Sequence, residues 1–117
     1  MGETGASAID PRWRKVAGLL GLGARGRLVV VGVERVREAA KRGKVLVAIV
    51  APDVSRHSKD KILPLLTARQ IEIVEGPSAS ALGAAVGRES TAVVGIVDRD
   101  LARGIRAAWT PAPAPAP

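Results

Sequence analysis

The sequence contains no cysteine and a single histidine, His57. Without thiols the chain cannot form a disulfide framework or a thiolate metal site, and one histidine cannot build a histidine metal cluster. No apolar run approaches the roughly 20 residues that a membrane-spanning helix needs. Residues 1–11 also lack the charged-then-apolar pattern of a signal peptide. We therefore expect a soluble, cytoplasmic protein without a metal site.

Aromatic residues are scarce: the chain has Trp13 and Trp109 but no Tyr and no Phe. Proteins that hold single-stranded nucleic acids stack the bases on aromatic side chains. An RRM or OB-fold mode of binding is therefore not expected. If RNA is bound, phosphate contacts, base edges and shape must hold it.

Positive charge is concentrated in one part of the chain. The formal net charge is +7, and residues 12–44 hold ten Lys or Arg against two Glu, whereas the remainder holds eight basic and nine acidic residues. This asymmetry favours an anionic partner near the first two predicted helices. A merely solvated basic face is the alternative, because genome composition can raise arginine content, and arginine outnumbers lysine thirteen to five.

Helical and strand patterns alternate along the chain. Four short apolar segments have the composition of buried strands: 28–31, 45–50, 71–74 and 91–97. Segments with helical spacing begin near Asp10, Val33, Ser55, Ser78 and Asp98. The alternation predicts one domain over 10–110, a three-layer α/β/α sandwich with a four-stranded, largely parallel (mixed) sheet. Residues 1–9 are predicted to be a flexible tail, and 111–117 a Pro/Ala tail or linker stub.

A glycine-rich segment, GLGARG at 21–26, matches the spacing of a dinucleotide-binding fingerprint. It follows a predicted helix and precedes a predicted strand, which is the reverse of the order that such a site requires. We interpret it as a turn in which Gly21 and Gly23 end the first helix. Further along, Pro64 is predicted to kink or split the third helix.

Two aspartates follow predicted strands, as catalytic acids often do. Asp53 and Asp98 each also precede a predicted helix, and capping that helix accounts for both, with Ser55 as a second capping residue beside Asp53. His57 has no neighbouring residues that indicate catalysis and is predicted to lie on the surface. The sequence therefore predicts no enzyme and no small-molecule cofactor.

The ordered segments resemble the L-seven-Ae / L-thirty-e ribosomal-protein superfamily over residues 14–109. The resemblance rests on GLLGLGARGRLVVVG at 18–32, KRGK at 41–44, VAIVAPDVS at 47–55, LGAAVG at 82–87 and VVGIVDRDLARGI at 93–105. The Asp-Val-Ser and DRDLARGI pieces are most similar to the bacterial YlxQ-like branch. The resemblance implies a kink-turn RNA-binding fold and a role near translation.

In that superfamily the RNA contact lies where the first strand meets the next helix, with the pattern Gly-x-Asn-Glu-x-x-Lys, and in the loop after the fourth helix. The resemblance places in these two regions Gly32, Glu34, Arg35, Glu38, Arg88, Glu89 and Ser90. Glu34, Arg35 and Glu38 depart from the Asn, Glu and Lys of the pattern. Five basic residues are further candidates for RNA binding because their positive charge can attract phosphates: Arg25, Arg27, Arg37, Lys41 and Lys44.

These observations predict a non-enzymatic protein that binds structured RNA, ribosomal or kink-turn-like, through a basic corner. We expect it to bind no membrane and to be monomeric without RNA. The alternative is a protein-interaction or regulatory module on the same fold that has lost kink-turn recognition.

Overall fold

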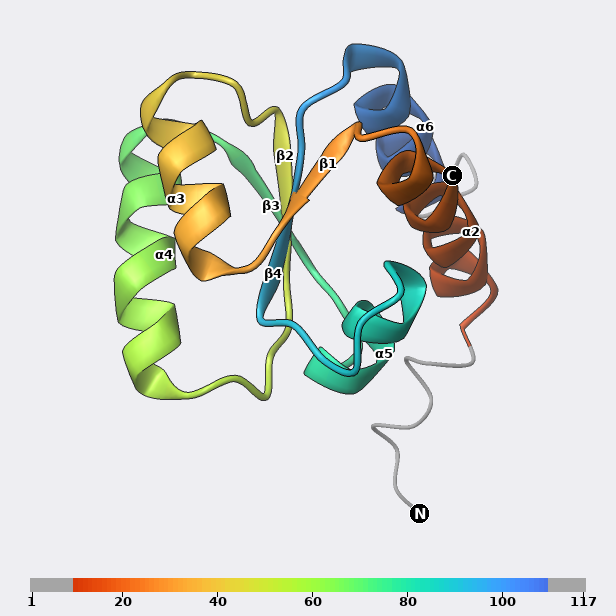
Figure 1. Cartoon of the computed structure of the whole chain (residues 1–117), viewed down its shortest axis with the longest axis horizontal. Coiled ribbons are helices and arrows are strands. Elements are labelled where there is room, and N and C mark those ends of the chain that lie inside the picture. The colour runs from red at the N-terminus through yellow and green to blue at the C-terminus, as the bar shows by residue number, and fades with distance from the viewer. Residues whose placement is uncertain (1–9, 110–117) are drawn as a thin grey trace, which may run out of the picture.

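The computed structural model describes residues 10–109, in which five helices and four strands alternate (Figure 1). Their order is α2 (Pro11–Arg25), β1 (Val29–Val31), α3 (Val33–Lys41), β2 (Val47–Val50), α4 (Arg56–Ala68), β3 (Glu72–Glu75), α5 (Ala79–Ala85), β4 (Val93–Ile96) and α6 (Arg99–Trp109). The tails predicted at 1–9 and 111–117 lie outside this range. Among the described helices, none combines the length and hydrophobicity that a bilayer crossing requires.

The four strands form one mixed sheet in the order β1-β4-β2-β3. β4 is antiparallel to both of its neighbours, with Val29 opposite Ile96 on one side and Val47 opposite Ile96 on the other. β2 and β3 are parallel, so β1, β2 and β3 run in one direction and β4 in the other. The predicted α/β fold with a mixed sheet is confirmed, and β1 is an edge strand.

The helices cover both faces of the sheet and make three layers, with α2, α5 and α6 on one face and α3 and α4 on the other (Figure 1). Successive side chains of β2 point to opposite faces of the sheet and so enter the two hydrophobic cores, one on each face. Val47 and Ile49 pack toward α2 and α6, whereas Ala48 and Val50 pack toward α3 and α4. The sheet is thus buried on both faces, which explains why its strands read as continuous apolar runs.

Local capping signals predicted the starts of several helices correctly. The Asp10 carboxylate accepts a hydrogen bond from the Arg12 N–H at 2.8 Å, and its contacts with the Arg12 guanidinium hold the pKa of that carboxyl below its usual value. The Ser78 hydroxyl accepts from the Ala81 N–H, and Asp98 Oδ2 accepts from the Leu101 N–H. Each of these bonds satisfies a first-turn N–H that the helix itself leaves unpaired.

The structure corrects one expectation about a helix end and narrows a second one about Pro64. α2 continues through Gly21 and Gly23 to Arg25, and the turn begins only at Gly26. Gly23 is buried, and a Cβ there would lie 2.5 Å from Leu101 Cδ2, so glycine lets α2 pack closely on α6 and does not end the helix. α4 is a single helix with Pro64 in its interior, so of the two predicted effects of Pro64, a kink or a split, the split does not occur.

Candidate functional site

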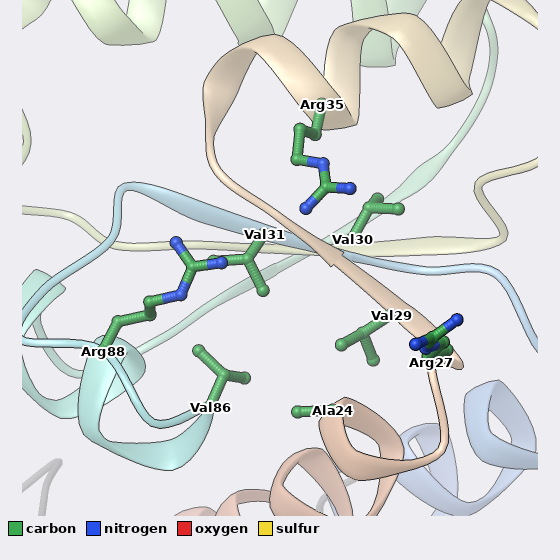
Figure 2. Close-up of a pocket in the computed structure, with 8 residues that line it drawn as sticks. All are labelled: Ala24, Arg27, Val29, Val30, Val31, Arg35, Val86 and Arg88. Atoms are coloured by element: carbon green, nitrogen blue, oxygen red, sulfur yellow. The ribbon is translucent and has the colours of Figure 1, made fainter.

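A groove of about 530 Å³ runs along the edge strand β1. Apolar side chains form its floor and walls, and three arginines stand around it (Figure 2). The lining residues are Ala24, Arg27, Val29, Val30, Val31, Arg35, Val86 and Arg88. Arg35 and Arg88 reach toward Val31 from different elements, and Arg27 lies near Val29 toward the other end of the strand (Figure 2).

Each arginine comes from a different segment. Arg27 lies in the turn between α2 and β1, with φ of 61°, and Arg88 lies in the loop between α5 and β4. Arg35 is in the first turn of α3. Residues separated by up to 61 positions in the chain therefore meet at one sheet edge.

Gly32 makes the corner between β1 and α3. Its φ of 101° is a conformation that residues with a side chain rarely adopt. Its N–H donates to the Val93 carbonyl and its carbonyl accepts from the Val36 N–H, both at 3.0 Å. No atom lies within 4 Å of where its Cβ would be, so the backbone at this corner is open to close approach by a ligand.

The loop that bears Arg88 is fixed against α5. The Arg88 N–H donates to the Gly83 carbonyl at 2.8 Å, and the Thr91 N–H donates to the Ala79 carbonyl at 3.0 Å. At Gly83 a Cβ would lie 2.4 Å from Ser90 Cα, so the loop can rest on the helix only because this residue is glycine. These contacts hold Arg88 beside the groove.

Asp53 supports the same region and corrects a prediction. Asp53 and Ser55 were both expected to cap α4, and only Ser55 does so, its hydroxyl accepting from the Ser58 N–H. Asp53 Oδ1 instead accepts from the Ala79 N–H of α5 at 2.7 Å. The carboxylate therefore ties the β2–α4 connection to the helix from which the Arg88 loop departs.

Positive charge dominates the groove. Within residues 10–109, none of Arg27, Arg35 and Arg88 forms an ion pair or a side-chain hydrogen bond, and no carboxylate lines the groove. A neighbouring hollow shares Val30 and Arg35 with the groove and extends the basic surface along α3. It is also lined by Glu38, Ala39, Arg42 and Lys44.

The remaining predicted residues lie around this groove and not in it. Glu34 pairs with Lys61 Nζ at 3.2 Å, and Arg37 Nη1 donates to the Lys61 carbonyl, so both connect α3 to α4. Glu38 and Arg42 form an ion pair one helical turn apart, at 3.9 Å. Four others are exposed and do not line the groove: Arg25, Lys41, Glu89 and Ser90.

Sequence reasoning did not identify the valines of β1, Ala24 or Val86 as part of a surface. Val29, Val30 and Val31 read as a fully buried strand, but each is only partly buried because β1 lies at the sheet edge. The two tryptophans lie elsewhere, with Trp13 and Trp109 packed edge to face at 6.5 Å and absent from the groove lining. The groove thus has no aromatic stacking surface. His57 is exposed, as predicted.

No group of three or more metal-binding side chains occurs anywhere in residues 10–109. The arrangement can attract an anion through three unpaired guanidinium groups. It can also let that anion approach the Gly32 backbone closely. Both capacities suit a polyanion with several phosphates better than a small metabolite.

Comparison with known proteins gives a consistent assignment. The model of the Ribosomal protein L7Ae/L30e/S12e/Gadd45 family matches residues 14–104. The solved structure of a protein with unknown function from Bacillus halodurans C is similar, with 33% identity and a TM-score of 0.74 over 80% of this chain and 95% of that one. The Giardia lamblia 15.5kD RNA binding protein shares the fold, with 22% identity and a TM-score of 0.69 over 81% and 82% of the two chains. No curated protein matches the sequence.

Proposed function

This chain belongs to the Ribosomal protein L7Ae/L30e/S12e/Gadd45 family, and from that premise we propose that it binds structured RNA at the corner between β1 and α3. One observation carries the proposal: three arginines from three segments converge on one groove whose described lining contains no carboxylate. The similarity to the Giardia lamblia 15.5kD RNA binding protein supports the same kind of partner.

In this proposal the residues have different roles. Arg27, Arg35 and Arg88 bind phosphates, and a guanidinium can do so through two parallel hydrogen bonds. Gly32 lets the RNA backbone approach the main chain. Further contacts and electrostatic attraction come from the surrounding candidates: Arg25, Glu34, Arg37, Glu38, Lys41, Lys44, Glu89 and Ser90.

The RNA that fits best is folded and not single-stranded, because the groove offers cations and shape but no aromatic surface on which bases could stack. We propose a ribosomal or kink-turn-like RNA and a YlxQ-like bacterial role near translation. The protein would act in the cytoplasm, as a monomer without RNA, and by binding alone, without a catalytic step.

Binding to a kink-turn RNA is expected to be strongly salt-dependent. Four cations line the groove and the neighbouring hollow: Arg27, Arg35, Lys44 and Arg88. If each neutralises one phosphate, log K should fall against log salt concentration with a slope of about −3 to −4. Fluorescence anisotropy of labelled RNA at several salt concentrations measures the slope. A complex whose affinity does not change with salt would rule out phosphate capture by these side chains.

A further inference from the structure

The outer edge of β1 presents unpaired backbone groups. On its inner side the Leu28 carbonyl accepts from the Val97 N–H, and the Gly32 N–H donates to the Val93 carbonyl, both at 3.0 Å. In antiparallel pairing successive residues alternate between facing the partner strand and facing away from it. Val29 and Val31 therefore direct their N–H and carbonyl groups away from β4, and no strand within residues 10–109 pairs with that side.

The groove leaves this edge accessible. α3 lies on one side of β1, and α2 and α5 lie on the other, so the strand edge forms the base of a channel between the helical layers (Figures 1 and 2). Proteins usually protect a strand edge of this kind with a charged side chain, a proline or a covering segment. Here Val29, Val30 and Val31 are partly exposed along the channel.

The pattern of donors and acceptors selects the kind of ligand. An RNA backbone offers mainly acceptors, its phosphate and sugar oxygens, and its one donor per nucleotide is the 2′-hydroxyl, which does not alternate with an acceptor at the spacing of a β-strand. An extended peptide offers an N–H and a carbonyl at alternate positions and can satisfy all four outward groups, as in strand addition to a sheet edge. The backbone edge therefore favours a peptide over a nucleic acid.

The surrounding charge selects the peptide's composition. Arg27 lies toward one end of the exposed strand, and Arg35 and Arg88 lie toward the other (Figure 2). We propose that this edge binds an extended acidic peptide segment of a partner protein as a fifth strand, with carboxylates at both ends of the segment paired to these arginines. A second copy of the chain fits poorly, because pairing two β1 edges would bring two sets of three arginines together.

The proposed peptide site goes beyond RNA binding and shares arginines with it. Peptide and RNA should therefore compete, because both require Arg35 and Arg88. Only the peptide requires the N–H groups of Val29 and Val31. A change confined to those N–H groups separates the two activities, so either can fail without the other.

The test uses the full chain and a fluorescein-labelled peptide, Glu-Asp-Val-Thr-Val-Asp-Glu, at low salt. Val31→Pro removes an outward N–H, and an edge strand tolerates proline at such a position. Val31→Ala keeps the N–H and is the matched control. We expect the peptide to bind the parent chain. Val31→Pro should lower the peptide affinity by about tenfold or more, because it removes one backbone hydrogen bond between the peptide and β1. Val31→Ala should change the peptide affinity by less than about threefold. RNA affinity should change by the same factor in both variants, because each keeps the three arginines and the Gly32 corner and only Val31→Pro removes the N–H.

Amide hydrogen exchange followed by NMR gives a second measurement that needs no variant. Val29 and Val31 should exchange rapidly in the free chain and at least about tenfold more slowly with the peptide bound. Absence of peptide binding, equal binding by Val31→Pro when that variant is folded, or unchanged exchange at both amides would each overturn the proposal. So would protection of those amides by RNA alone or by self-association of the chain.

Discussion

Replacing Arg27, Arg35 and Arg88 together by alanine is expected to weaken binding of structured RNA by about 100-fold or more. Hydrogen bonds to charged groups each contribute on the order of 1 kcal/mol or more, and each 1.4 kcal/mol is about a factor of ten in affinity. All three side chains are exposed and unpaired in the described structure, so the fold should be retained. Anisotropy with a kink-turn RNA, together with thermal unfolding, measures both effects.

The matched control removes the same amount of charge elsewhere. Arg14, Arg69 and Arg99 are also exposed, form no ion pair or side-chain hydrogen bond within residues 10–109 and line neither of the hollows beside β1. Their triple alanine variant should weaken RNA binding less than about fivefold, because salt screens charges that lie farther than roughly 8–10 Å from the ligand. Equal losses in the two triple variants would mean that net charge, and not the groove, determines binding.

Changing Gly83 to alanine is expected to lower the free energy of unfolding by about 2–3 kcal/mol, because overpacking against a fixed backbone costs that much. The added Cβ would lie 2.4 Å from Ser90 Cα and 2.6 Å from Ser90 N, so the loop or the helix has to move. In a domain of this size the melting temperature should fall by about 10 °C or more. RNA affinity should fall too, because the displaced loop bears Arg88.

Gly18→Ala provides the control for helix propensity. Gly18 is also within a helix, but it is exposed and nothing lies within 4 Å of its missing Cβ. Alanine there should stabilise the chain by about 0.5–1 kcal/mol and leave RNA binding unchanged. If Gly83→Ala is as stable as the parent chain, the close contact between α5 and the 87–91 loop is not the constraint described.

The sequence predicts those parts of the fold that short-range interactions determine. Asp10, Ser78 and Asp98 cap helices that begin within three residues of them, so local patterns suffice. Asp53 and Gly23 were misassigned because their partners are distant in the chain. Asp53 bonds to Ala79, 26 positions away, and Gly23 packs against Leu101.

The candidate site was predictable only in part for the same reason. The β1–α3 corner consists of consecutive residues, so Gly32 and Arg35 could be placed together from the sequence. The meeting of Arg27, Arg35 and Arg88 depends on the strand order, which leaves β1 at an edge. No local pattern reveals that order. Sequence reasoning therefore could not separate Glu34 and Arg37, which contact α4, from Arg35, which lines the groove.

The most direct test is ultraviolet crosslinking of the full chain to RNA in cells, followed by mass spectrometry of the crosslinked peptides and sequencing of the bound RNA. The account predicts crosslinks within residues 27–38 and 86–90, on fragments of folded RNA. Crosslinks confined to α4 or α6, or no crosslinked RNA at all, would contradict the claim that this corner binds structured RNA.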